Sequence, residues 1–262
     1  MTESRNPVKK TAVQKQADVF WEQTKKHVDF PEEHRGTDIR VEVTDPVGIA
    51  LAPHLTCVLL ISDLHIKLLR NDTDRPFITS DNPVVQYNQL LEQKTTLDCI
   101  TGYGIKGIQI FIPITPRYML LLYDSQVYYV GRKKRKVVSI DKRHEIDQLN
   151  TLQIVNNIQM VYGNEGMTEE YITGLYVKTK SINRPRQSIT SNIKMDEGRS
   201  FFYYGSSSCK IALGLSFVAY STYASRLKFN PNGVFFPRDF ALEMADALAN
   251  DPRFQDLGQF RL

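Results

Sequence analysis

The side chains best suited to chemistry in this chain belong to four polar residues: Asp81, Asn82, Arg117 and Asn150. Asp81 and Asn82 follow a predicted strand, Pro76–Ser80, and Pro83 keeps Asn82 in an extended or turn conformation. A carboxylate and an amide at a strand end could bind a cation or act on a substrate, and Arg117 could bind a phosphate or carboxylate with two hydrogen bonds. The alternative is a polar turn in which Asp81 and Asn82 bond nearby backbone groups.

Arg117 and Asn150 also have structural interpretations. An ion pair between Asp81 and Arg117 would serve only to stabilise the fold, and it explains Arg117 as well as an anion-binding role does. Asn150 falls early in a predicted helix of about residues 142–162. We favour a role in which its amide bonds the backbone of a neighbouring loop, such as the Ser80–Pro83 turn, because this would bring distant motifs together.

The sequence shows no metal site built from thiols or imidazoles. Its three cysteines are far apart, no two histidines have a spacing of three or four, and the motifs HExxH, GxxxxGK[ST] and GxSxG do not occur. Asp63 and His65 would share one face of a strand, so they could form a cluster with Asp81, although a surface histidine is the simpler account. We expect no cofactor; a hydrolase built on Asp81 would need Mg²⁺ or Mn²⁺ held by oxygen ligands.

A run of five consecutive cations marks a predicted hairpin tip: Arg132, Lys133, Lys134, Arg135 and Lys136. Such a run in a turn is usually a solvated surface that discourages aggregation. It could instead contact the phosphates of nucleic acid, and the nearby Tyr128 and Tyr129 could stack on single-stranded bases. The run is the strongest indication of nucleic-acid binding in the sequence.

Composition is that of a globular protein. The chain has 262 residues, of which 42% are hydrophobic and 24% charged, and its net charge is +4. These values exclude fibrous and disordered classes, and the mild positive charge does not by itself predict nucleic-acid binding. The first residues are polar, and the longest apolar run, residues 47–64, contains Pro53 and Asp63. We therefore expect no membrane association and a cytoplasmic protein with free thiols at Cys57, Cys99 and Cys209.

Hydrophobic patterns predict an α+β fold with a central, mainly antiparallel sheet flanked by helices. The predicted helices are residues 8–28, 45–61 with a break at Pro53, 142–162 capped by Asp141, and 239–250. The predicted strands are residues 39–43, 64–69, 76–80, 108–116, 118–123, 127–130, 136–140, 171–177 and 201–204, with 211–219 either strand or helix start. Two hairpins are expected, one joining 64–69 to 76–80 and one joining 127–130 to 136–140. We expect one domain over residues 1–262.

Three motifs stand in the middle of the chain: Phe77-Ile-Thr-Ser-Asp-Asn-Pro-Val84, Phe111-Ile-Pro-Ile-Thr-Pro-Arg117, and Asn150 in a helix ending at Val161-Tyr162. Together they resemble the mostly bacterial family catalogued as domain of unknown function 4238. The likeness covers a core of about residues 50–165, which leaves 166–262 as a C-terminal extension. The His-Tyr-Val-Pro type segment that usually begins family members is not found before Trp21. Because the family has no assigned activity, the resemblance implies residues to test rather than a reaction.

Two hypotheses of function stay open. The favoured one is a non-catalytic binding or regulatory module that recognises nucleic acid, a nucleotide or a protein partner, with bacterial stress or phage defence as a setting suggested only by association. The alternative is a metal-dependent phosphodiester hydrolase with Asp81 as metal ligand or general base. Convergence of Asp81, Asn82, Arg117 and Asn150 on an open pocket would favour the hydrolase, and a packed turn would favour the module.

Overall fold

The computed structural model describes residues 58–92, 100–182, 188–194, 200–206, 211–228 and 237–250. The chain divides into two compact units. The first consists of Met1–Thr56 and Leu248–Leu262, and the second, which contains the central sheet, is Cys57–Ala247. The predicted helix 8–28, the predicted strand 39–43, most of the predicted helix 45–61 and all three cysteines lie outside the described residues. The extent of one domain over 1–262 stays a prediction.

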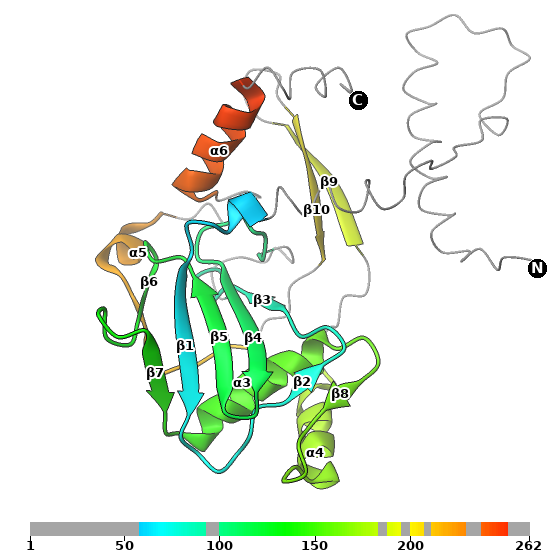
Figure 1. Ribbon diagram of the computed structural model, residues 1–262. Helices are drawn as coiled ribbons and strands as arrows, with labels where there is room; N and C mark the ends of the chain where they lie inside the picture. Colours follow the sequence, from blue (N-terminus) through cyan, green and yellow to red (C-terminus); the bar gives the residue numbers. More distant parts are fainter. Residues whose placement is uncertain are drawn as a thin grey trace, which may run out of the picture. The chain divides into compact units, whose positions relative to one another are not determined.

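A five-stranded sheet forms the centre of this unit (Figure 1), with the strand order β3-β4-β5-β1-β7. Its strands are β1 (His65–Asn71), β3 (Val85–Tyr87), β4 (Gln109–Thr115), β5 (Tyr118–Tyr123) and β7 (Val137–Ile140). Every neighbouring pair is antiparallel except β1 and β7, which are parallel. The predicted α+β class with a mainly antiparallel sheet is therefore confirmed, and β5 lies at its centre as its continuous apolar run predicts.

One hydrophobic core cluster contains residues of helix α3 (Arg143–Asn156) and residues from one face of the sheet. Leu69, Phe111 and Leu121 are fully buried in that cluster with Ile146 and Leu149 of the helix. Burial of these apolar side chains stabilises the unit.

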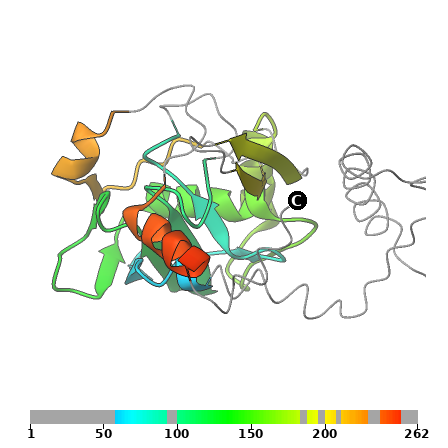
Figure 2. The same cartoon turned by 90° about the horizontal axis from the view of Figure 1, so that it is seen from above.

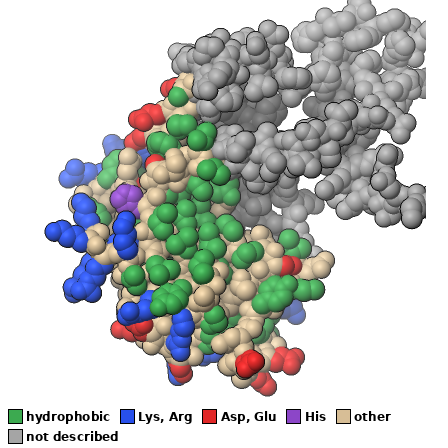
Figure 3. All heavy atoms as spheres, in the orientation of Figure 1, with side chains coloured by type: hydrophobic (Ala, Val, Ile, Leu, Met, Phe, Trp, Pro, Cys, Tyr) green, Lys and Arg blue, Asp and Glu red, His purple; other side chains and the backbone are tan. Residues whose placement is uncertain are grey.

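The opposite face of the sheet is also apolar but more open. It carries Ile66 of β1, Leu122 of β5 and Ile112 of β4, of which Ile66 is 50% exposed. Figure 3 shows hydrophobic side chains gathered along the middle of the view, in the orientation in which Figure 1 presents the sheet.

Shorter elements surround the sheet. Three two-stranded pairs are β2 (Thr79–Ser80) with β8 (Val161–Tyr162), β6 (Tyr128–Val130) with β11 (Val218–Tyr220), and β9 (Ser188–Lys194) with β10 (Ser200–Ser206). The described part of the chain also includes the helices α4 (Glu169–Thr179), α5 (Thr222–Arg226) and α6 (Asp239–Asn250). Figure 2 shows α4 and α5 on opposite sides of the sheet region, as Figure 1 does. No described helix is both long and apolar enough to cross a bilayer.

Both predicted hairpins are wrong. β1 pairs with β5 and β7, while Thr79–Ser80 pairs with β8, so the segment after β1 leaves the sheet. β6 pairs with β11 instead of β7. Gly131 has a φ of 56°, and the added Cβ of any other residue would lie 2.7 Å from Cγ2 of Val138. Glycine adopts this left-handed conformation without a steric cost, and Gly131 stands directly before the five cations Arg132–Lys136.

The predicted strand 171–177 is wrong as well, because the segment lies within α4. The hydroxyl of Thr168 accepts the N–H of Tyr171 and caps the helix, and Glu169 and Glu170 occupy its first turn. A cap followed by acidic residues is a helix start that outweighs the β propensity of the tyrosine and isoleucine.

Candidate functional site

Asp81 lies in the turn after β2, and its carboxylate is fully engaged with backbone. Oδ1 accepts the N–H of Ile158 at 2.9 Å, and Oδ2 accepts those of Gln159 at 2.8 Å and Met160 at 3.1 Å. These hydrogen bonds, that of Ile158 first, hold the pKa of Asp81 below its ordinary value. The side chain is exposed, yet its lone pairs already bind three donors. Asp81 therefore has the geometry of a residue that shapes a turn.

The same three N–H groups explain where α3 ends. The predicted helix 142–162 stops at Asn156, and Asn157 has an extended ψ of 152°. In a longer helix, the N–H groups of residues 158–160 would bond carbonyls within the helix. Asp81 accepts them instead, so the chain turns away and pairs as β8 with β2. The predicted cap is also wrong: Lys142, not Asp141, is the N-cap residue, and its side chain makes no capping hydrogen bond.

Asn82 is joined to the last turn of α3 by reciprocal amide contacts. Its Nδ2 donates to the carbonyl of Asn156 at 3.2 Å, and Nδ2 of Asn156 donates to the carbonyl of Asn82 at 2.7 Å. One turn earlier, Gln153 accepts from the hydroxyl of Ser80 at 3.0 Å and donates to the carbonyl of Pro83 at 3.0 Å. The Ser80–Pro83 turn is thus fixed to the helix by two side chains.

Asn150 fixes the strand-like segment that precedes this turn. Its Oδ1 accepts the N–H of Ile78 at 3.0 Å, and its Nδ2 donates to the carbonyl of Pro76 and to the hydroxyl of Tyr171, each at 3.0 Å. The residue is fully buried. Asn150 does bond the backbone of a neighbouring segment, as we favoured, but its backbone partners are Pro76 and Ile78. Gln153 and Asn156 bond the Ser80–Pro83 turn instead.

Arg117 is not part of this arrangement. It lies in the turn between β4 and β5, and its guanidinium donates to the carbonyls of Asn71 and Thr73. The proposed ion pair with Asp81 is therefore not formed. The structure brings Asp81, Asn82 and Asn150 together around α3 and leaves Arg117 with the loop after β1.

The conjectured cluster of Asp63, His65 and Asp81 is not formed either. Asp63 pairs with Arg238, which is 2% exposed and also donates to carbonyls of Leu60 and Tyr103. The ring of His65 meets that of Tyr123 edge to face, with centroids 6.0 Å apart. Within the described residues, no three His, Cys, Asp or Glu side chains gather so that they could hold a metal ion.

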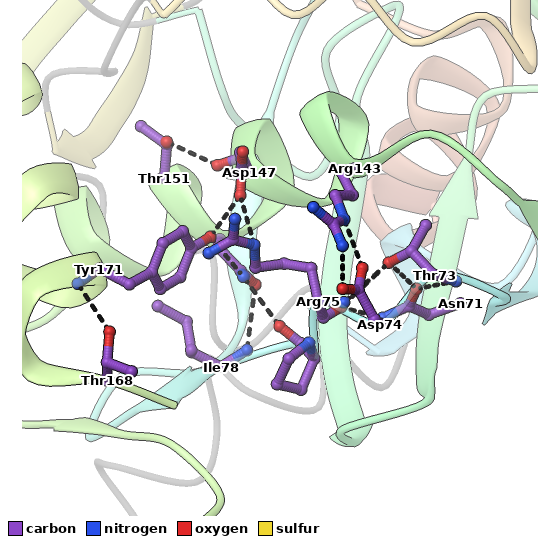
Figure 4. A network of polar contacts seen from close by, with 12 residues as sticks. Asn71, Thr73, Asp74, Arg75, Ile78, Arg143, Asp147, Thr151, Thr168 and Tyr171 are labelled. Carbon is purple, nitrogen blue, oxygen red and sulfur yellow. Dashed lines mark hydrogen bonds and ion pairs between the residues drawn. The ribbon is translucent and has the colours of Figure 1, made fainter. Parts of the chain in front are cut away.

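A network that the sequence did not reveal lies beside Asn150 (Figure 4). The guanidinium of Arg75 stands 4.0 Å from the ring centroid of Tyr171, and its Nε lies 3.4 Å from Oδ1 of Asp147. The hydroxyl of Tyr171 donates to the same oxygen at 2.6 Å. Burial, together with Asp147, raises the pKa of Tyr171 well above its ordinary value. The sequence signal that could have indicated this network is the spacing of three between Asp147 and Asn150, which places both side chains on one face of α3.

The basic residues 132–136 form a loop around a buried ammonium group. Lys67 of β1 is 5% exposed, and its Nζ donates to the carbonyls of Arg132 at 3.0 Å, Lys133 at 3.5 Å and Arg135. The loop carbonyls therefore face inward, and all five cationic side chains are exposed. Figure 3 shows Lys and Arg side chains gathered at the corresponding edge of the molecule. Burial, and then the charge of Lys136, lowers the pKa of Lys67.

A cavity of about 160 Å³ adjoins the segment that precedes Asp81, between Phe77–Thr79, Pro113–Pro116 and Tyr162–Asn164. Its lining does not include Asp81, Asn82, Arg117 or Asn150. Asp81 and Asn82 thus form a turn bonded to the end of α3 and the residues after it, and none of the four candidate residues lines this cavity.

Replacement of Asn150 by leucine should destabilise the fold by about 2–4 kcal/mol, because the N–H of Ile78 and the carbonyl of Pro76 would stay buried without partners. Urea denaturation measures the change. The control is Asn164→Ala, at an exposed loop asparagine, which should stay within about 0.5 kcal/mol of wild type. Equal stability of the two variants would refute the anchoring role of Asn150.

The contribution of Asp81 to stability should depend on pH. Its folded pKa lies below the ordinary value of 3.8, so the stabilisation is present above that value and is lost as the pH falls through the folded pKa. The melting temperature of Asp81→Asn should lie below that of wild type at neutral pH, and the difference should shrink in acid. A difference that is independent of pH would show that the charge is immaterial.

Comparison with curated proteins and with solved structures gave no match. The pattern of one protein family matches residues 2–166, which is more than half of the chain and includes the Ser80–Pro83 turn, the β4–β5 hairpin and α3. The match ends before α4, so the helix that supplies Tyr171 lies beyond it. The chain belongs to the family described as protein of unknown function DUF4238.

Proposed function

We propose that this protein is a binding module that recognises nucleic acid through the basic loop, which we define as Gly131–Lys136. The observation that carries the proposal is the tether of this loop to Lys67. A solvated run of cations needs no internal support. Here a buried ammonium group turns three carbonyls inward, which commits the five charged side chains to the solvent side.

The chemistry of the basic loop fits the phosphate backbone. Each Lys or Arg that neutralises a phosphate releases counterions, so several adjacent cations give affinity that depends steeply on salt and little on sequence. A loop held in one conformation loses less entropy on binding than a mobile one does. The tether by Lys67 therefore increases the affinity that five charges can give.

An exposed aromatic side chain lies next to the basic loop and favours a single-stranded ligand. Tyr129 of β6 is 55% exposed, whereas its neighbour Tyr128 is 1% exposed. Only two residues separate Tyr129 from the first cation, Arg132. Stacking of a base on such a ring stabilises single-stranded nucleic acid without selecting a sequence.

The alternative of a Mg²⁺- or Mn²⁺-dependent phosphodiester hydrolase is less well supported. Asp81 would have to release up to three backbone N–H groups before its carboxylate could bind a metal or accept a proton. Asn82 and Asn150 have structural partners as well. The setting that we propose for the module is the bacterial cytoplasm; a role in stress or phage defence stays a hypothesis that no residue carries.

Replacement of Arg132, Lys133, Lys134 and Arg135 by serine should leave the fold intact and weaken binding to single-stranded oligonucleotides of any sequence. The slope of log affinity against log salt should flatten by roughly 0.7 for each phosphate that the variant no longer neutralises. Fluorescence anisotropy at several salt concentrations measures both quantities.

The matched control removes the same charge elsewhere. It replaces four exposed cations outside the basic loop by serine: Lys178, Lys180, Arg226 and Lys228. This variant should bind nearly as wild type does. If both variants lose the same affinity, or neither loses any, the basic loop is not the nucleic-acid site.

Replacement of Lys67 by methionine separates tethering from charge, because all five exposed cations stay in place. Affinity for the same oligonucleotides should fall, while the salt slope should change by less than the roughly 0.7 that one neutralised phosphate contributes. Unchanged affinity in a folded Lys67→Met variant would show that the tether does not matter for binding.

A further inference from the structure

A second feature of the unit, separate from the basic loop, is a cavity of about 470 Å³ between the start of α3 and the chain before and within β11. Its polar lining consists of Gln89, Glu92, His144, Glu145, Ser216 and Tyr220, and leucine and valine side chains complete it. The described lining includes two carboxylates and no Lys or Arg. The volume lies in the range of small-molecule sites.

One wall of this cavity, within residues 213–218, is held by side chains. Glu92 accepts the N–H of Leu213 at 3.3 Å, and Glu145 accepts that of Ser216 at 2.6 Å. Gln89 donates to the carbonyl of Leu213 at 2.9 Å. The cavity is therefore formed without a ligand, and a ligand would not have to order this wall.

Each carboxylate in the lining has an oxygen to spare. Oε1 of Glu145 accepts from Ser216, and no described group donates to Oε2, although the residue is 1% exposed. Oε2 of Glu92 accepts from both Tyr87 and Leu213, and no described group donates to Oε1. Burial raises the pKa of Glu92. Withdrawing a carboxylate from water while one of its oxygens lacks a donor is costly. Glu145 is largely buried and Glu92 is partly buried.

The position of Glu145 in the first turn of α3 offsets part of this cost, because the positive end of the helix dipole favours a negative charge. Glu92 is not in a described helix or strand and has no such compensation. An ammonium group in the cavity would supply donors to these carboxylates, which both line it. The leucine and valine side chains offer apolar surface to a short hydrocarbon chain.

We infer that this cavity binds a small aliphatic amine, whose ammonium group donates to Glu92 and Glu145 and whose hydrocarbon part contacts the apolar lining. Two carboxylates in a lining with no described Lys or Arg disfavour phosphates and carboxylates as ligands of this cavity. The site is distinct from the basic loop, which selects anions.

Putrescine is the probe, with butanediol as its neutral analogue and succinate as its counterpart of opposite charge. Calorimetry and thermal melts of the wild-type chain should show saturable binding and a raised melting temperature for putrescine alone. Absence of saturable binding up to millimolar concentrations would overturn the inference, and so would equal effects of the diol.

Charge-removing variants locate the site. Glu145→Gln and Glu92→Gln each retain an oxygen that accepts from the wall, and each should weaken putrescine binding by roughly tenfold or more, which corresponds to about 1.4 kcal/mol. Glu165→Gln, at an exposed carboxylate outside the cavity, should bind as wild type does. Unchanged affinity in both cavity variants would contradict the inference.

Two further results keep the inference testable if a cavity variant fails to fold. A crystal structure of the wild-type chain with putrescine should place an ammonium group within hydrogen-bond distance of Glu92 and Glu145; density elsewhere only would overturn it. The basic-loop serine variant should still bind putrescine, so failure of nucleic-acid binding and failure of amine binding are distinguishable. Stabilisation by Mg²⁺ in place of putrescine would identify a metal site and refute an amine site.

Discussion

The fold depends on how the chain satisfies its backbone after it leaves β1. The segment from Pro76 to Val84 lies against α3 and joins the central sheet only at β3. Thr79 and Ser80 pair with β8, and the backbone groups on either side of them need other partners. Buried backbone groups must be paired. Amide side chains of α3 at a spacing of three supply hydrogen bonds to this backbone: Asn150 to Ile78, Gln153 to Pro83 and Asn156 to Asn82. A helix thus completes the hydrogen bonding of an extended segment, and the Ser80–Pro83 turn takes its shape from that helix.

Asp81 extends the same principle to the other side of the turn. By accepting three consecutive N–H groups it competes with the helix for them and sets the place where α3 ends. The family motif therefore describes a junction between three elements, β2, α3 and β8. Polar residues at such a junction resemble a catalytic set in sequence, because both need carboxylates and amides in fixed positions. The hydrogen-bond partners distinguish the two cases.

The parts of the fold that the sequence predicted well are those in which local pattern and tertiary contacts agree. The apolar runs of β4 and β5 flank a Thr-Pro turn, and both strands were predicted close to their observed bounds. The fold class, α6 and the structural role of Asn150 were also predictable. The two hairpins were not, because partner choice depends on contacts far along the chain: β7 joins β1 in parallel across more than sixty residues. The Lys67 tether and the cavity beside the start of α3 were equally hidden, since both join segments that no local pattern links.

The strand β1 links the basic loop to the core, because its side chains alternate between the two faces of the sheet. Lys67 and Leu69 share one face, so the lysine that holds the loop and the leucine that fills the core are two residues apart on the same side. A slip of β1 by one residue would turn both to the opposite face at once. Loss of the loop conformation and loss of core packing would then be a single event. A chain that misfolds in this register would present its cations on a mobile loop, and it would be distinguishable from the native protein by its charge distribution as well as by its stability.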